Sequence, residues 1–295
     1  KAALEEQHLP GINLIYADRE DNIYFVSNGM FPYRDSNYDW TQVLPGDTSA
    51  TLWEPVWHPF EEIPKYENPE SGYLFNTNAQ VYNATGAGEN LKPEDINPTF
   101  GYKTYDNNRS IRSRKLIERY DKIDYEDFKT IKYDRKLDTA MYTYALENMS
   151  YFREIDPEEN PKIADALQVI RDRNFETESH NEEAAMVILS FYHLAEIIQD
   201  NATMYERNTL PEEEFITGVK KAKKLMKKHF GSLRVPLGEV QRHVRGDVSL
   251  PIGGAPDVIA SNYSKPWKKG RYKTFVGESY IMLCRYSEAG VEIET

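Results

Sequence analysis

An α+β fold is predicted for this chain of 295 residues by the order of its strand-like and helix-like segments. Strand-prone runs separated by Gly, Pro and Asn occupy residues 11–105 and again 234–294, whereas amphipathic runs fill 109–230. Strands, then helices, then strands again are typical of folds in which helices are segregated from antiparallel sheets. The length suggests one large domain or two ordinary ones. We therefore divide the chain into 1–108, 109–230 and 231–295.

The first part, 1–108, begins with a predicted hairpin. Two β-prone runs, 12–17 and 22–27, flank the charged turn 18–21. The segment that follows is rich in aromatic residues and is broken by Pro32, Pro45, Pro55, Pro59, Pro64 and Pro69. Each proline removes a donor and constrains its predecessor, so this segment cannot be regular helix or central strand. We expect aromatic packing to order it, a strand over 73–78 and loop over 83–108.

The second part, 109–230, is predicted to be helical. The spacing of Ile111, Leu116, Ile117 and Tyr120 approximates one helix face. Further helices are expected over 125–133, 139–152, 160–173, 182–199 and 211–229. Residues 182–199 are apolar nearly all round, so this helix should be buried. The lysines between 220 and 228 are expected to form a solvated helix face rather than an anion-binding patch.

The third part, 231–295, returns to strands. Glycines at 246, 253, 254, 277 and 290 separate the strand-prone runs. The predicted strands cover residues 239–245, 248–252, 272–276, 280–286 and 291–293.

Composition excludes several classes of partner. Lys and Arg number 36 and Asp and Glu number 48, giving a formal charge of −12, which argues against nucleic acid and anionic membranes. The longest apolar stretch, 184–198, is interrupted by polar residues and is too short to span a bilayer. Cys284 is the only cysteine, so no intrachain disulfide can form, and its apolar surroundings predict a packed core position.

Motifs of known chemistry are missing from the sequence. The six histidines are scattered singly and no His-Glu-x-x-His occurs, so no metal site is predicted. No Gly-x-x-x-x-Gly-Lys-Ser/Thr or Gly-x-Gly-x-x-Gly motif indicates a nucleotide cofactor, and no Gly-x-Ser-x-Gly motif indicates a nucleophilic serine. These patterns alone indicate only an acidic globular α+β protein.

A run of landmarks nevertheless resembles the penicillin acylase family in order and spacing. In the first part these are GINLIYAD (11–18), NI (22–23), GMFPYR (29–34), WEP (53–55), EEIP (61–64), NPESGY (68–73) and NTN (76–78). Arg109 with Ile111, Arg112, Leu116 and Ile117 resembles the family's arginine-bearing helix start. Four further motifs resemble the acyl-homoserine-lactone acylase branch of the family in particular: GEVQR (238–242), RG (245–246), LPIGG (250–254) and GESY (277–280).

The resemblance implies part of a layered αββα N-terminal-nucleophile hydrolase core with an inserted helical region. In this family a precursor cleaves itself, and the new N-terminal serine of the β subunit attacks an amide carbonyl with its own amine as base. The implied substrates are linear amides, either penicillin-type or N-acyl-homoserine lactones. The implied partners are the α subunit and the start of the β subunit. No cofactor is implied, and the calcium sites of relatives cannot be mapped onto this chain. The implied location is the periplasm or the exterior.

Two site residues follow from the resemblance. Asn78 falls on the family's oxyanion asparagine, which with a backbone N–H stabilises the tetrahedral intermediate. Arg109 falls on the arginine that helps hold the network around the nucleophile's amine. The residues alone leave simpler roles open, namely a capped strand end for Asn78 and a surface or helix-start charge for Arg109.

The chain also departs from the family pattern. Lys1 cannot act as the serine nucleophile, so we expect an internal piece of a β subunit that is inactive alone. Asp21 replaces a usual Gly, and Ala79-Gln80 replaces a usual Asn-Pro, so the loop beside Asn78 is expected to differ. An alternative is a non-catalytic module of the same fold, in which segment 31–75 binds acyl chains or a protein.

Overall fold

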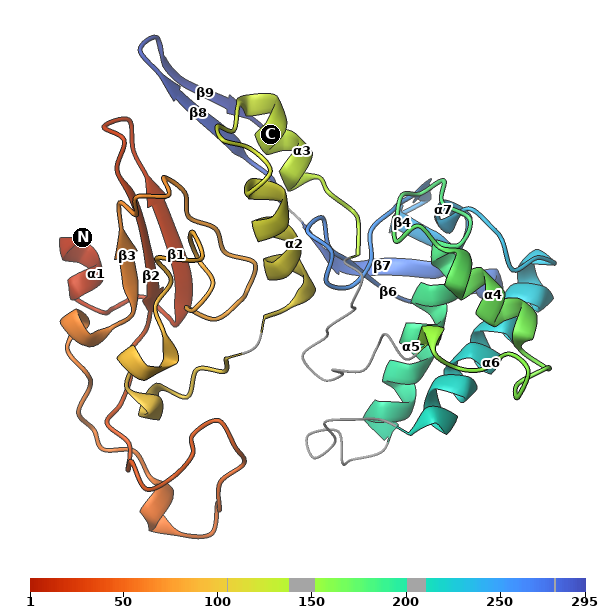
Figure 1. The fold of residues 1–295 in the computed structure, drawn as a ribbon, viewed down its shortest axis with the longest axis horizontal. Helices are drawn as coiled ribbons and strands as arrows, with labels where there is room; N and C mark the ends of the chain where they lie inside the picture. The colour runs from red at the N-terminus through yellow and green to blue at the C-terminus, as the bar shows by residue number, and fades with distance from the viewer. Residues whose placement is uncertain (105, 138–151, 201–210, 279) are drawn as a thin grey trace. The chain divides into compact units, whose positions relative to one another are not determined.

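The structure is a computed structural model that describes residues 1–104, 106–137, 152–200, 211–278 and 280–295. The chain forms two compact units. Unit 1 comprises residues 1–106 and 283–294, and unit 2 comprises residues 107–282 and residue 295 (Figure 1). Helices and sheets occur together, which confirms the α+β class. No helix in these described ranges is both long and apolar enough to cross a membrane.

Unit 1 is built on an antiparallel sheet of order β1-β2-β3. β1 (Ile12–Ala17) and β2 (Ile23–Asn28) form the hairpin expected from the sequence, and β3 (Lys65–Glu67) adds a short edge. Asp18 closes the turn, because its carboxylate accepts backbone N–H groups of Asn22 and Glu20, which lowers the pKa of Asp18. Asp21 has a left-handed φ of 63°, a conformation that Gly adopts more readily than a residue with a Cβ.

The core of unit 1 lies against β2. Phe25 and Val26 are almost fully buried and pack with residues of the proline-rich segment and of the loops after β3: Phe60, Ile63, Tyr66, Val81 and Phe100. Unit 1 also holds helix α1 (Ala2–Glu5) and the short 3₁₀ turns η1 (Ser49–Thr51), η2 (Phe60–Glu62), η3 (Pro93–Asp95) and η4 (Pro98–Phe100). Aromatic packing therefore orders the segment, as expected.

The hairpin β8 (Leu283–Ser287) and β9 (Gly290–Glu294) also belongs to unit 1. The hydroxyl of Tyr286 donates to the carbonyl of Ala17, which joins this hairpin to the end of β1. The expected core position of Cys284 is wrong. Leu283 is buried, and because side chains alternate along a strand, Cys284 points to the opposite, solvent-exposed face.

Unit 2 combines a helical layer with a four-stranded sheet. Its helices are α2 (Asn108–Ile117), α3 (Tyr125–Lys132), α4 (Ala164–Asp172), α5 (Ala184–Asp200), α6 (Glu212–Phe230) and α7 (Leu237–Val240). Its strands are β4 (Gln241–Arg245), β5 (Val248–Pro251), β6 (Asn262–Pro266) and β7 (Tyr272–Gly277), with the 3₁₀ turn η6 (Lys268–Gly270). The sheet order is β5-β4-β7-β6, and only the β4–β7 pair is parallel.

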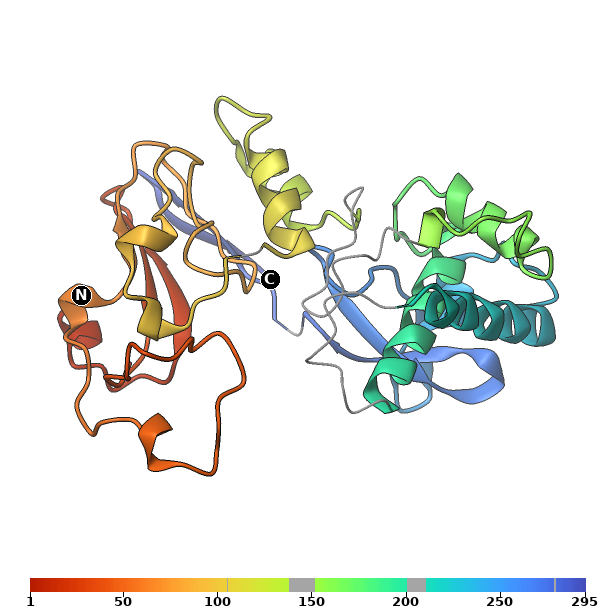
Figure 2. The same cartoon turned by 60° about the horizontal axis from the view of Figure 1, so that its bottom comes forward.

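The core of unit 2 centres on α5, which lies beside α6 in both views (Figures 1 and 2). Residues 184–189 and Leu194 are buried, which confirms that α5 is the buried helix. Gly218 permits close packing, because a Cβ there would lie 2.9 Å from the Ser190 carbonyl oxygen. The lysines of α6 at 220, 221, 224, 227 and 228 are exposed, as expected for a solvated face.

Several expected boundaries are wrong for local reasons. Residues 73–78 form no strand, because Phe75 N–H pairs with the Ala84 carbonyl in a loop rather than with a strand. α4 begins at Ala164 rather than at 160, since a turn in which Asn160 N–H donates to Asp156 comes first. Residues 239–240 belong to α7, which follows Pro236. Strand β8 begins at Leu283 rather than at 280. The helix expected over 139–152 lies almost wholly outside the described residues.

Candidate functional site

Asn78 lies on a polar loop of unit 1 that is anchored to strand β1. The Asn78 backbone N–H donates to Asn76 Oδ1 at 3.0 Å, which forms an Asx turn. Asn13, on β1, donates from Nδ2 to the same Asn76 oxygen at 3.3 Å and to the Ala79 carbonyl at 3.2 Å. The turn carrying Asn78 is therefore fixed on both sides by one strand side chain.

The backbone of Asn78 adopts a left-handed conformation with φ of 57°. Asn tolerates this region better than other residues with a Cβ, and its side chain here is exposed. The neighbouring Ala79 is buried, so the chain turns inward directly after Asn78. This geometry presents a carboxamide to solvent from a defined backbone position.

The buried Tyr66 holds the segment that follows Asn78 through two hydrogen bonds of its hydroxyl group. Its hydroxyl donates to the Val81 carbonyl at 2.6 Å and accepts the Leu91 N–H at 2.8 Å. Burial raises the pKa of Tyr66 to about 12, so its phenol stays protonated and remains a donor at neutral pH. The segment that follows Asn78 is thus tied to β3, which carries Tyr66.

Arg109 lies in the first turn of α2, in unit 2. Asn107 caps this helix by accepting the Ser110 N–H at 2.8 Å. Arg109 Nε donates to Asp257 Oδ1 at 3.0 Å, and Asn108 N–H donates to Asp257 Oδ2 at 2.9 Å. The side chains of Arg109 and Asp257 are 17% and 5% exposed, so the ion pair is largely removed from water. Arg109 is therefore more than a free surface charge.

Opposing effects act on the pKa of Asp257. Burial raises its pKa, whereas the Asn108 N–H and the Arg109 guanidinium act in the opposite direction without fully offsetting burial. Its backbone is left-handed, with φ of 61°. One carboxylate thus orients Arg109 and also accepts the backbone N–H of Asn108 at the start of α2, where negative charge is favourable.

The two expected site residues belong to different units, and each is held by contacts within its own unit. Sequence reasoning missed Asn13, Asn76 and Asp257 as their supports. Asn76 stands in the Asn-Thr-Asn motif and could have been proposed as an Asx turn. No local signal links Asp257 to Arg109, because 148 positions separate them.

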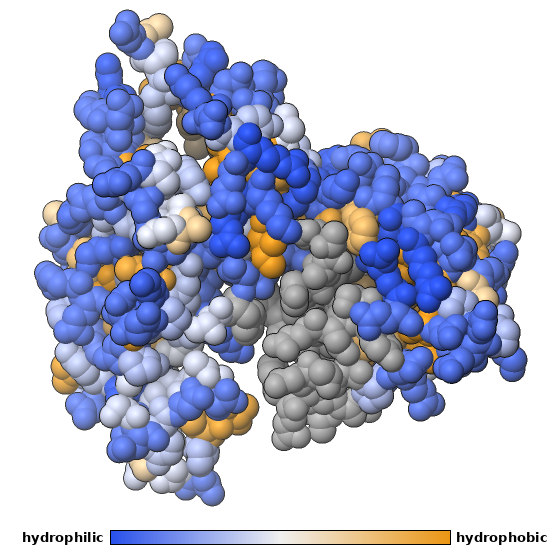
Figure 3. All heavy atoms as spheres, viewed as in Figure 1, coloured by the Kyte–Doolittle hydropathy of each residue, from blue (hydrophilic) through white to orange (hydrophobic). Residues whose placement is uncertain are grey.

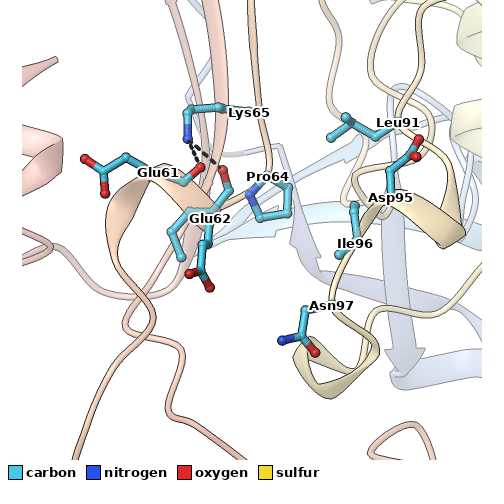
Figure 4. Close-up of a pocket in the computed structure, with 9 residues that line it drawn as sticks. Glu61, Glu62, Pro64, Lys65, Leu91, Asp95, Ile96 and Asn97 are labelled. Atoms are coloured by element: carbon cyan, nitrogen blue, oxygen red, sulfur yellow. Dashed lines mark hydrogen bonds between the residues drawn. The ribbon is translucent and has the colours of Figure 1, made fainter.

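A cavity of about 440 Å³ in unit 1 is lined by Glu61, Glu62, Lys65, Asp95 and Asn97 among others (Figure 4). Lys65 Nζ donates to the carbonyls of residues 60, 61 and 63, which completes the turn η2. Burial lowers the pKa of Lys65. The Lys65 ammonium is therefore used in hydrogen bonds to backbone carbonyl groups. Across the described ranges, no cluster of three or more His, Cys, Asp or Glu side chains could hold a metal ion.

Comparison with known proteins identifies the class to which this α+β chain belongs. The family model described as penicillin amidase matches residues 1–293. The chain therefore belongs to the penicillin amidase family, a family of hydrolases that act as acylases.

Two relatives illustrate the similarity. Penicillin G acylase of Escherichia coli is 43% identical over 67 residues, which are 23% of this chain and 8% of that protein. The solved structure of thermostable penicillin G acylase from Alcaligenes faecalis has a TM-score of 0.49 and 15% sequence identity, over 96% of this chain and 57% of that chain. The match thus spans less than two thirds of either relative.

Proposed function

We propose that this chain is part of an acylase that hydrolyses linear amides, and that it contributes Asn78 and Arg109 to the reacting site. The observation that carries the proposal is the family match over residues 1–293. The anchored turn at Asn78 and the buried ion pair of Arg109 support it, because both motif residues are held in defined positions. Pre-positioned groups are what catalysis requires of such residues.

In the proposed reaction an N-terminal serine, supplied by another segment of the precursor, attacks the amide carbonyl carbon. The serine hydroxyl proton passes to the serine's own α-amine, and the carbonyl oxygen becomes an oxyanion. Asn78 Nδ2 donates to that oxyanion. The C–N bond then breaks, the amine departs with the proton, and water hydrolyses the acyl-enzyme.

Arg109 is proposed to hold the hydrogen-bond network around that α-amine. Asp257 accepts a hydrogen bond from Nε of Arg109, so the plane of the guanidinium is fixed before substrate arrives. Positive charge near an amine disfavours its protonation and keeps the base free at neutral pH. The partial neutralisation by Asp257 moderates this effect, so the orientation of Arg109 matters as much as its charge.

The proposed substrates are penicillin-type amides or N-acyl-homoserine lactones, with no cofactor and no catalytic metal. The proposed location is periplasmic or secreted, and the proposed partners are the α subunit and the start of the β subunit. These finer statements follow the family resemblance of the sequence motifs.

A non-catalytic binding module is the second candidate, and the exposed apolar side chains of the β2–β3 loop favour it. Val43, Leu52 and Trp53 are 86%, 71% and 59% exposed. Hydrophobic colour gathers in small patches, one of them over this loop (Figure 3). Exposed apolar groups of this kind can bind acyl chains or proteins.

The test uses the complete precursor and the 295-residue chain in parallel. Each is incubated with phenylacetyl amides and with N-acyl-homoserine lactones, and released amine is measured. We expect turnover by the processed precursor and none by the chain alone. A precursor with no Ser, Thr or Cys directly after its cleavage point, and with no turnover, would favour the binding module.

A further inference from the structure

A cavity of about 410 Å³ lies within unit 2, against one face of the β5-β4-β7-β6 sheet. His243 and Arg245 alternate onto the same face of β4 as Gln241. Gln241 lies beside Tyr272 in the parallel β4–β7 pair, which places Thr274 of β7 on this face as well. Cavities of this size hold small organic molecules.

The polar groups on this face divide into satisfied and unsatisfied ones. Ser264 Oγ contacts Gln241 Oε1 at 3.1 Å and Thr274 Oγ1 at 3.3 Å, so this part of the sheet is internally paired. Asn262 lines the cavity and is only 3% exposed. Its Nδ2 donates to the Gly253 carbonyl at 3.1 Å, whereas Oδ1 has no donor among the described residues.

Ser261, also at the cavity wall, has a buried Oγ with no hydrogen-bond partner in the described chain. A buried acceptor without a donor costs about 1–3 kcal/mol, and native structures leave few such groups. An amide oxygen without a donor beside a buried hydroxyl without a partner therefore points to a ligand that brings an N–H or O–H group.

The charges around the cavity leave a positive surplus. Arg135 donates to Glu178 at 3.0 Å, and Glu278 is paired with Lys132. Arg245 donates only to the carbonyl of Val244, at 3.0 Å, and forms no ion pair with any residue that the structure describes. A local cationic site on a chain of net charge −12 is well suited to a small anion.

We propose that this cavity binds a small monoanionic carboxylate that carries a neutral hydrogen-bond donor next to the acid group. The carboxylate pairs with Arg245, whose planar fork suits two oxygens. The hydroxyl or amide N–H of the ligand donates to Asn262 Oδ1, and the Ser261 hydroxyl donates to the ligand's hydroxyl or amide oxygen. Ile252 and Ile281 supply apolar contacts for the remainder. This proposal goes beyond the acylase function and does not depend on it.

A series of related ligands tests the proposal. The affinity of the unmodified 295-residue chain for each of them is measured by isothermal titration calorimetry. Phenyllactate carries the acid and a hydroxyl, and N-acetylphenylalanine carries the acid and an amide N–H. 3-Phenylpropanoate lacks the donor and phenyllactamide lacks the charge. We expect both of the latter to bind about tenfold more weakly than phenyllactate. The relative affinities of phenyllactate and N-acetylphenylalanine then decide between a hydroxyl and an amide donor.

A matched pair of variants locates the site. Arg245→Gln should remove the preference for phenyllactate over phenyllactamide, whereas Lys221→Gln, the same charge change on the exposed face of α6, should keep it. Circular dichroism verifies that both variants are folded. The proposal is overturned if neither acid with a donor gives saturable binding, if 3-phenylpropanoate binds as tightly as phenyllactate, or if the two variants behave alike.

Discussion

Arg109 and Asp257 form an ion pair in which Nε and Oδ1 are 3.0 Å apart, and the second oxygen of Asp257 accepts the backbone N–H of Asn108. One carboxylate therefore fixes both an arginine and the start of the helix that carries it. The pair joins α2 to the loop between β5 and β6 within unit 2. Its loss should affect stability as well as any reaction that uses Arg109.

Asp257→Asn should lower the free energy of unfolding of unit 2 by about 2–3 kcal/mol. The substitution leaves a mostly buried guanidinium without its counter-charge, and the exposure of Arg109 keeps the cost near the lower end for such pairs. Urea unfolding followed by far-UV circular dichroism measures it, because the long helices belong to unit 2.

Asp172→Asn is the matched control for that experiment. Asp172 pairs with Arg234, but these side chains are 39% and 38% exposed, so its loss should cost less than about 1 kcal/mol. Equal effects of the two substitutions would contradict a buried structural role for Asp257.

Tyr66→Phe should destabilise unit 1 by about 2 kcal/mol. The change leaves the Leu91 N–H and the Val81 carbonyl without their hydroxyl partner in a buried position. Tryptophan fluorescence during urea unfolding reports on it, since Trp40, Trp53 and Trp57 belong to unit 1. Tyr16→Phe, on an exposed residue, should change stability by less than about 0.5 kcal/mol.

Alkaline pH should destabilise unit 1 through its buried tyrosines. Burial raises the pKa of Tyr66 and of Tyr102 to about 12 from the ordinary value of 10.0. The folded state then holds these protons more tightly than the unfolded state, so their contribution is fully present below pH 10 and is lost between about 10 and 12. A free energy of unfolding that stays level across this window would contradict the burial of both phenols.

The sequence predicted much of this architecture because its signals are local. The hairpin around Asp18, the buried α5 and the amphipathic α6 follow from turn chemistry and apolar periodicity, and each is present. The short strands β3 and β6 were not predicted. Each carries or adjoins a proline and has few apolar residues, so its pairing depends on the neighbouring strand rather than on its own sequence.

The candidate site could be predicted only in part. The family resemblance points to Asn78 and Arg109, but their supports are long-range. Asn13 reaches Asn76 across 63 positions, and Asp257 reaches Arg109 across 148. The exposure of Cys284 was also missed, because an apolar run does not reveal which face of an isolated hairpin is covered.

Arg109→Leu in the complete enzyme should lose activity mainly near neutral pH and recover part of it at higher pH. Removing a positive charge near the nucleophile's amine raises the pKa of that amine, which then carries a proton at neutrality and cannot act as base. Arg109→Lys keeps the charge but loses the planar fork, so its acidic limb should shift less. The pH profile of kcat/KM measures both, and an unchanged profile for Arg109→Leu would remove Arg109 from the mechanism.

The acylase account is tested most directly by the kcat of Asn78→Gly in the complete enzyme. Gly adopts the left-handed φ of 57° without strain, so this change removes the carboxamide and preserves the turn, whereas Ala would add strain. We predict that kcat falls by about a hundred- to a thousandfold with little change in KM, the usual result of losing one oxyanion donor. A variant that retains full kcat would contradict the account and leave Asn78 as a turn residue only.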